Sequence, residues 1–305
     1  MAANNEFARS ILDGLKRTPK YTEPRWLYDA VGAKLFEAIC ELDTYYVTRV
    51  EMSILNAHAA DIADALGEGV SIVEPGSGAA LKVRPILDAL GPRAKAYVPI
   101  DIAAGQLAAT AAELGKRYPH LTVSPVATNF FAPFTMPPVD NGVVFFPGST
   151  IGNMPRESGV EFLNRMLDRS GATRLLIGFD LVKDKAVLEL AYDDPAGVTR
   201  AFKMNVLHRI NRELGADIDL RTFEFESLYN ETSQAIEMYL TSKIGQSVHI
   251  AGETIAFAAN ERISTEDSRK YTLESFSDFA AACGLKPVQS WLDDDQYFAL
   301  MLLSR

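Results

Sequence analysis

The chain has 305 residues, 48% of them hydrophobic and 23% charged, which is typical of a folded soluble protein and unlike disordered, collagen-like or coiled-coil chains. At roughly 150 residues per domain, this length predicts two structural units or one enlarged α/β domain. The 40 acidic residues exceed the 30 basic ones, and the formal charge of −10 repels polyanions. We therefore expect a small-molecule ligand, and neither nucleic acid nor an anionic membrane as a partner.

Cysteine, histidine and hydropathy patterns narrow the class further. The two cysteines, Cys40 and Cys283, and four scattered histidines form no disulfide framework and no zinc-like spacing. The first residues lack a basic segment followed by an apolar stretch, and no apolar run approaches the roughly 18 residues that span a bilayer. We expect a cytoplasmic protein without a metal site. Structural roles are assigned to the histidines, which are His58, His120, His208 and His249.

In chain order, short apolar runs alternate with helical stretches from Val70 onward. The expected strands lie at 70–74, 96–101, 121–127, 143–147 and 175–180, and the expected helices at 79–90, 103–118 and 157–169. Strands that alternate with helices predict right-handed crossovers and a mostly parallel sheet that is covered on both faces.

The rhythm changes after residue 180. A helical stretch over 184–214 and strand-like segments near 223–228, 234–242 and 247–258 indicate an inserted lobe. The chain then resumes with a helix at 273–283 and strands at 287–292 and 297–303. A terminal hairpin that closes a parallel sheet is typical of class I methyltransferases, whereas an NAD-binding Rossmann domain continues with a parallel strand.

A nucleotide-type site is predicted at the ends of the first three strands. Gly76 and Gly78 follow the first strand and allow a tight turn with close ligand approach, although such a turn can be a plain connection. Asp101 ends the second strand, where it can accept both ribose hydroxyls or cap the next helix. Asn129 and Phe130 end the third strand, where an amide and a ring suit adenine, or the ring packs in the core. This set favours S-adenosylmethionine over NAD, because the third glycine of a pyrophosphate turn is absent.

Longer motifs carry a resemblance to a known family. They lie at 26–32, 45–49, 148–153, 180–184, 191–199 and 265–268. On these residues the chain resembles the bacterial histidine-specific Nα-methyltransferases, which form hercynine on the route to ergothioneine. The resemblance implies a class I S-adenosylmethionine-dependent methyltransferase with a Rossmann-like seven-stranded sheet and an inserted α+β substrate-binding domain. The expected core is 51–182 and 271–305, the expected substrate domain is 9–50 and 183–270, and we expect a monomer.

The resemblance also implies roles for the cofactor residues. Gly76 and Gly78 match positions beside the methionine part of S-adenosylmethionine, Lys82 lies near its carboxylate, and Asp101 holds the ribose. Asn129 and Phe130 match the adenine position. Family members commonly carry aspartate where this chain has Asn129, and an amide can still accept from the adenine amino group, so we expect retained binding with altered strength.

The resemblance likewise implies roles for the substrate-binding residues. Tyr45, Tyr192 and Asn153 match the clamp on the amino-acid carboxylate and α-amine, where hydroxyl and amide groups can aim the amine at the methyl. Tyr28 matches the tyrosine near that amine, so Tyr28 and Asn153 are the catalytic candidates.

Glu266 and Ser268 match the residues that hold the imidazole, and their spacing of two puts them on one side of an extended segment. Met238 matches the methionine beside the ring. By itself Met238 is compatible with ordinary core packing, and Glu266 with a solvated charge.

The predicted reaction is Nα-trimethylation of L-histidine to hercynine, the first step of ergothioneine biosynthesis. Two alternatives stay open. One is an N-methyltransferase for another aromatic amino acid, such as tryptophan or dimethylallyltryptophan, and the other is a non-catalytic module that binds S-adenosylmethionine.

Overall fold

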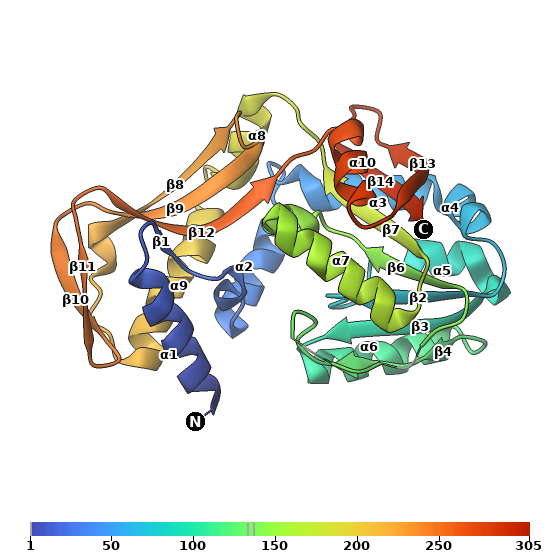
Figure 1. Cartoon of the computed structure of the whole chain (residues 1–305), viewed down its shortest axis with the longest axis horizontal. Helices are drawn as coiled ribbons and strands as arrows, with labels where there is room; N and C mark the ends of the chain where they lie inside the picture. Colours follow the sequence, from blue (N-terminus) through green and yellow to red (C-terminus); the bar gives the residue numbers. More distant parts are fainter. Residues whose placement is uncertain (1, 133, 137) are drawn as a thin grey trace. The chain divides into compact units, whose positions relative to one another are not determined.

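A computed structural model describes residues 2–132, 134–136 and 138–305, and Figure 1 shows the path of the chain. The residues group into two units, each built from segments that are distant in the sequence. Unit 1 comprises Met1–Tyr46 and Lys183–Arg269, and unit 2 comprises Val47–Val182 and Lys270–Arg305. No helix in the described part of the chain has both the length and the apolar character needed to cross a bilayer.

Unit 2 contains one large sheet. Its strands are β2 (Val70–Pro75), β3 (Ala94–Asp101), β4 (Thr122–Val123), β5 (Val126–Ala127), β6 (Gly142–Phe146), β7 (Arg174–Asp180), β13 (Lys286–Leu292) and β14 (Phe298–Ser304). The order is β13-β14-β7-β6-β2-β3-β4, and β5 also pairs with β3. Strands β7 to β4 run parallel, whereas β14 lies antiparallel to both β7 and β13. This arrangement confirms the predicted class I fold with its terminal hairpin.

The helices of this sheet are α3 (Tyr46–Ala57), α4 (Ala59–Leu66), α5 (Arg84–Leu90), α6 (Ala104–Arg117), α7 (Arg156–Ser170) and α10 (Leu273–Ala281), with short 3₁₀ turns η2 (Gly91–Arg93) and η3 (Thr150–Asn153). Strands β2 and β6 are buried along their whole length, as expected for parallel strands covered on both faces. In the core, Phe179 stacks on Phe276 with ring centroids 3.9 Å apart.

Two predicted elements of unit 2 differ in detail. The expected strand 121–127 is split into β4 and β5, and Pro125, which lacks an N–H for the ladder, lies between them. The expected helix 79–90 begins only at Arg84, where Pro85 occupies a position in the first turn that favours helix initiation. Residues 79–83 therefore extend the glycine turn rather than the helix.

Unit 1 contains a smaller mixed sheet and its helices (Figure 1). The sheet has the order β1-β12-β9-β8, from strands β1 (Lys20–Tyr21), β8 (Phe223–Asn230), β9 (Ala235–Ser242) and β12 (Glu261–Arg269). Strands β10 (Gln246–Ile250) and β11 (Glu253–Phe257) form a separate hairpin. The helices are α1 (Ala2–Leu15), α2 (Ala30–Cys40), α8 (Lys185–Tyr192) and α9 (Val198–Leu214), with 3₁₀ turns η1 (Pro24–Leu27) and η4 (Leu220–Thr222).

Two expectations for this lobe were wrong in their boundaries. The predicted single helix 184–214 breaks into α8 and α9, because Asp194 accepts hydrogen bonds from the N–H groups of Val198 and Thr199 and starts a new helix. Asp194 therefore has a structural role in the turn before α9. The predicted strand 247–258 turns back at Ala251 and Gly252, both of which have positive φ, and forms the β10–β11 hairpin.

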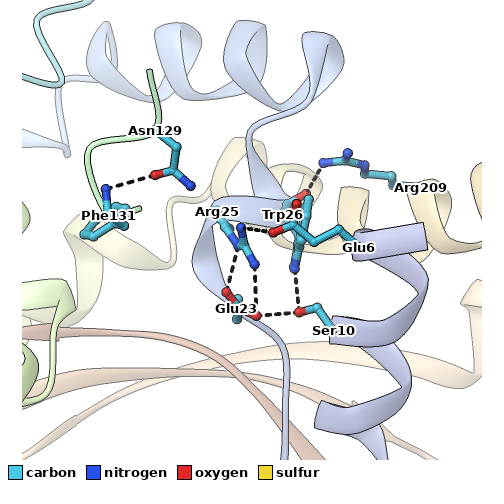
Figure 2. A network of polar contacts seen from close by, with 8 residues as sticks. All are labelled: Glu6, Ser10, Glu23, Arg25, Trp26, Asn129, Phe131 and Arg209. Carbon is cyan, nitrogen blue, oxygen red and sulfur yellow. Dashed lines mark hydrogen bonds and ion pairs between the residues drawn. The ribbon is translucent and has the colours of Figure 1, made fainter. Parts of the chain in front are cut away.

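A polar network ties the N-terminal segment of unit 1 to α9 (Figure 2). Arg25 donates from Nε to Glu23 at 2.7 Å, and Glu23 accepts from Ser10 at 2.5 Å. The indole of Trp26 donates to Ser10 at 2.8 Å, while Arg209 of α9 donates to the Trp26 carbonyl at 3.0 Å. These bonds hold η1 against α1 and α9.

Candidate active site

In unit 2, the glycine turn after β2 leaves backbone open to a ligand. Gly76 and Gly78 have φ of +74° and +51°, a conformation that other residues rarely adopt. A Cβ on Gly78 would meet no atom within 4 Å, so this backbone faces open space, whereas a Cβ on Gly76 would lie 3.5 Å from the Phe130 ring. The turn can therefore admit a ligand close to its main chain.

Asp101 ends β3 at the same edge of the sheet, because the carboxyl ends of parallel strands lie together. Its two carboxylate oxygens accept from the backbone N–H of Gly78 at 3.0 Å and of Ala103 at 2.9 Å. A carboxylate offers about four lone-pair sites, so capacity for two ribose hydroxyls remains. Asp101 thus orients the glycine turn and the start of α6 while it can still bind a diol.

Asn129 and Phe130 follow β5. The Asn129 Oδ1 accepts from the Phe131 backbone N–H at 3.0 Å, which fixes the side chain over its own loop (Figure 2). The Phe130 ring packs on Phe131 and Phe162, with centroids 4.5 and 5.8 Å away. The Phe130 ring therefore packs against other aromatic rings and also lies close to Gly76.

Lys82 belongs to a buried charge network that the sequence did not reveal. Its Nζ lies 2.7 Å from Glu51, whose carboxylate also accepts from the Gly148 backbone N–H at 2.8 and 3.0 Å. Glu51 is fully buried in α3. Gly178 leaves the room for it, since a Cβ there would lie 2.0 Å from Glu51 Oε1. Glu51 carried no sequence signal, because an acidic residue in an amphipathic helix normally faces solvent.

Glu74, at the end of β2, was also missed. It is 2% exposed and accepts a 2.5 Å hydrogen bond from the Tyr97 hydroxyl. Burial raises the pKa of Glu74 to about 8, despite the opposing effects of this hydrogen bond and of Lys82. The carboxyl beside the glycine turn is consequently protonated in most molecules at neutral pH.

Asn153 is placed by the turn that follows β6. Gly148 and Ser149 both have positive φ, and the chain then enters η3, which ends at Asn153. The Ser149 hydroxyl accepts from the backbone N–H of Asp180 at 3.0 Å, which ties this turn to the end of β7. Asn153 is half-buried and belongs to unit 2.

In unit 1, the structure brings Tyr45, Tyr192 and Ser268 together. The two tyrosine rings meet edge to face with centroids 5.8 Å apart. The Tyr192 hydroxyl lies 2.8 Å from Ser268 Oγ, and either oxygen can donate in this bond. All three residues are at most 8% exposed.

Glu266 lies two residues before Ser268 on β12 and is 7% exposed, so the alternative of a solvated charge does not apply. It pairs with Lys203 of α9, a residue that is itself 1% exposed. Glu266 is also the cross-strand partner of the buried Met238 on β9. Lys203 was not predicted, because nothing in its local sequence distinguishes it from the solvated lysines of a helix.

Tyr28 follows η1 and packs edge-on against Phe36 and Phe202, with ring centroids 5.4 and 5.2 Å away. The residue as a whole is 41% exposed, yet the pKa of its hydroxyl lies well above the usual value. The main cause is desolvation among the surrounding protein atoms, and the negative charge of Glu266 adds to it. The hydroxyl therefore stays protonated at neutral pH.

The sheet order, the antiparallel terminal hairpin and the open glycine turn define a class I S-adenosylmethionine-dependent methyltransferase. Within that class, the family of S-adenosylmethionine-dependent, histidine-specific methyltransferases matches residues 7–305, and the chain belongs to this family. The predicted resemblance, the enzyme class and the cofactor are thereby confirmed. Among the described residues, no group of three His, Cys, Asp or Glu side chains could hold a metal ion.

Named relatives agree with the family. The histidine N-alpha-methyltransferase of Mycolicibacterium smegmatis is 39% identical over 310 residues, with 100% of this chain and 96% of the relative covered. Its counterpart in Mycobacterium tuberculosis is also 39% identical, with 97% and 94% covered. Ergothioneine biosynthesis protein 1 of Neurospora crassa is 29% identical over 95% of this chain but only 34% of its own length.

Proposed function

We propose that this enzyme transfers three methyl groups in succession to the α-amine of L-histidine and forms hercynine, the first step of ergothioneine biosynthesis. The observation that carries the proposal is the buried pair of Glu266 and Ser268 on β12, in a chain that belongs to the histidine-specific family over 7–305. A carboxylate and a hydroxyl can serve the two nitrogens of an imidazole. An amino acid without an imidazole would forgo the hydrogen bonds that these two groups can make to the ring nitrogens, at about 0.5–1.5 kcal/mol for a neutral bond and about 1.5–3 kcal/mol for one to a charged group.

The groups proposed to hold the cofactor fit its chemistry. When bound, S-adenosylmethionine supplies an electrophilic methyl group on a sulfonium sulfur. The open backbone at Gly76 and Gly78 suits the methionine part, and Lys82 suits its carboxylate. Asp101 keeps acceptor capacity for the ribose hydroxyls. Asn129 and Phe130 are proposed for adenine, with the second lone pair of Asn129 Oδ1 available as the acceptor.

The remaining proposed residues align the substrate. Tyr45, Tyr192 and Asn153 hold the α-amine and carboxylate, and Met238 packs beside the ring. Restricting both ends of the amino acid aims the amine along the axis of displacement, where an N–C bond forms while the S–C bond breaks. The attacking amine must first lose a proton. Because its own hydroxyl stays protonated, Tyr28 assists as a hydrogen-bonding relay to water rather than as a phenolate base.

Aromatic residues also suit the product. Each methylation after the first enlarges a cationic nitrogen, and the trimethylated product carries a permanent quaternary charge. Rings such as those of Tyr28 and Tyr45 stabilise such a cation through their faces. Unit 1, which carries both tyrosines together with Glu266 and Ser268, is accordingly proposed as the substrate-binding domain.

A competition assay tests the proposal. The purified protein is given S-adenosylmethionine and an equimolar mixture of the common amino acids, and the products are identified by mass spectrometry. We expect histidine carrying one, two and three methyl groups. Methylation of tryptophan without histidine would assign the chain to another aromatic substrate, and cofactor binding without any methylated amine would leave only a binding module.

A substitution of Glu266 tests the proposed contact with the imidazole. Glu266→Ala should raise the KM for histidine about 10–100-fold, which corresponds to losing a hydrogen bond to a charged group of about 1.5–3 kcal/mol. Binding of S-adenosylhomocysteine should change little. Glu261→Ala, on the same strand in a more exposed pair with Lys20, is the matched control. Equal losses for histidine and S-adenosylhomocysteine would contradict the assigned contact.

A further inference from the structure

We propose that Lys203 decides the charge state in which histidine is bound: its pairing with Glu266 makes the imidazole subsite select the neutral ring over the imidazolium. Lys203 is a positioning residue, since it acts through Glu266 and not on the substrate. The inference rests on the proposed function, because it takes Glu266 as the partner of the ring.

The pair is buried on both sides. Lys203 lies on α9 with a side chain 2% exposed, and the Glu266 side chain is 7% exposed. The Lys203 ammonium is held in a direct hydrogen bond to Glu266 Oε2 and lies 5.2 Å from the centroid of the Phe202 ring. A lysine in such surroundings has no water to hydrate its charge, so the ion pair is its main source of stabilisation.

This pairing changes what the carboxylate can attract. A buried carboxylate without a cation would favour the positively charged imidazolium, because an opposite charge nearby stabilises the protonated form of a base. With Lys203 in place, Glu266 and its partner have no net charge, and the lysine ammonium repels a second cation. Glu266 can still accept one N–H from a neutral ring, so the hydrogen bond remains while the preference for positive charge is lost.

The hydroxyl groups proposed for the other end of the imidazole do not select between its neutral and protonated forms. Ser268 Oγ and the Tyr192 hydroxyl lie 2.8 Å apart, and either can be the donor. Ser268 can therefore donate to a neutral ring nitrogen or accept from a protonated one, with Tyr192 reversing its own role. The discrimination between ring forms consequently comes from the charges at Lys203 and Glu266.

Several neighbouring elements place titratable groups near the pair of Lys203 and Glu266. They are Tyr21 on β1, Tyr28 after η1, Cys40 on α2, Tyr192 on α8, Glu237 on β9 and Asp267 on β12. The pKa of Tyr21 is raised to about 12 and that of Tyr28 is also raised, so both stay neutral. The pKa of Asp267 is raised by burial and then by Glu237, and Asp267→Asn is included to separate its charge from that of Lys203.

The test measures the affinity of L-histidine by titration calorimetry at pH 7.5 and 5.5, with S-adenosylhomocysteine present at saturation. With an imidazole pKa near 6.5, the neutral fraction of free histidine falls about tenfold between these two values. Wild type should therefore bind about tenfold more weakly at pH 5.5. In Lys203→Met the dependence should reverse, with equal or tighter binding at pH 5.5.

Three further proteins separate charge from packing. Lys203→Met/Glu266→Gln removes both charges together and should lose the reversal. Asp267→Asn, and Lys16→Met in a surface pair with Glu253, should keep the wild-type dependence. A Lys203→Met protein with the same pH dependence as wild type would overturn the inference, provided wild type methylates histidine. Absence of histidine methylation by wild type would instead contradict the proposed function.

A measurement on wild type keeps the inference testable even if Lys203→Met does not fold. Histidine labelled with ¹⁵N in the ring is bound to the wild-type protein at pH 5.5, and its ring nitrogens are observed by NMR. We expect the two distinct nitrogen signals of a neutral ring, one protonated and one not. The pattern of an imidazolium, with both nitrogens protonated, would overturn the assignment.

Discussion

Each unit of the molecule contains a buried glutamate paired with a lysine, and the two pairs differ in their access to water. In unit 2, Glu51 is fully buried but its partner Lys82 keeps 23% of its side chain exposed. In unit 1, both Lys203 and Glu266 are buried. Both carboxylate oxygens of Glu51 additionally share the single backbone N–H of Gly148.

The difference in hydration shows how two ion pairs of the same composition can serve different purposes. The Lys82 ammonium is partly hydrated and has three N–H donors, so it can reach a ligand carboxylate while it stays paired with Glu51, which suits its proposed place beside the methionine part of the cofactor. Lys203 cannot exchange its partner for water. Its charge is therefore a fixed part of the substrate-binding unit, and it sets the electrostatics of Glu266 permanently.

Matched lysine substitutions test this comparison most strongly. Lys203→Met should lower the free energy of unfolding by about 3–5 kcal/mol, because it leaves a buried carboxylate without its counter-charge. Lys82→Met should cost less, about 2–3 kcal/mol, because the fully buried Glu51 also loses its counter-charge but keeps the Gly148 backbone N–H as a donor. Chemical denaturation followed by circular dichroism measures both.

The double variant Lys203→Met/Glu266→Gln is the control, because it removes both buried charges and should recover most of the loss. If Lys82→Met proved as damaging as Lys203→Met, the distinction between a hydrated and a fixed lysine would have to be abandoned.

A smaller effect is expected at Glu74, a buried carboxyl of unit 2 that has no lysine partner in a direct ion pair among the described contacts. Its folded pKa of about 8 exceeds the ordinary value of 4.5, so the native state holds a proton that the unfolded chain releases. The resulting stabilisation is fully present below pH 4.5 and is lost as the pH rises through 8.

Wild type should accordingly lose about 2–3 kcal/mol of unfolding free energy relative to Glu74→Gln between pH 5.5 and 7.5, at about 1.4 kcal/mol per pH unit. The measurement is the free energy of unfolding of both proteins at several pH values in this range. Parallel pH profiles for the two proteins would show that Glu74 does not retain its proton.

The smallest expected effect concerns the start of α9, the helix that carries Lys203. Asp194→Ala removes the acceptor for the N–H groups of Val198 and Thr199 and should cost about 1–2 kcal/mol. Asp193→Ala, at the neighbouring position, is the control and should change stability by less than about 0.5 kcal/mol. A melting temperature lowered only by Asp194→Ala would support the cap, and equal shifts would argue against it.

Local sequence patterns were enough to predict the class of fold and the positions of several candidate groups. The alternation of apolar runs and helical stretches, with a hairpin at 287–303, predicted the parallel sheet and its antiparallel end. Asp101 could be placed at the ligand edge because strand ends in parallel sheets lie together. Such features depend on local periodicity, and periodicity is visible in one dimension.

Tertiary structure alone decided which charges are buried and with which partners. Lys203 and Glu266 are 63 positions apart, and Glu51 and Gly148 are 97 positions apart. A lysine or glutamate on a helix normally faces water, so no local pattern marks the exceptions. Their burial depends on the packing of α9 and β12 in one unit, and of α3 with the turn after β6 in the other, where desolvation makes each charge require its partner.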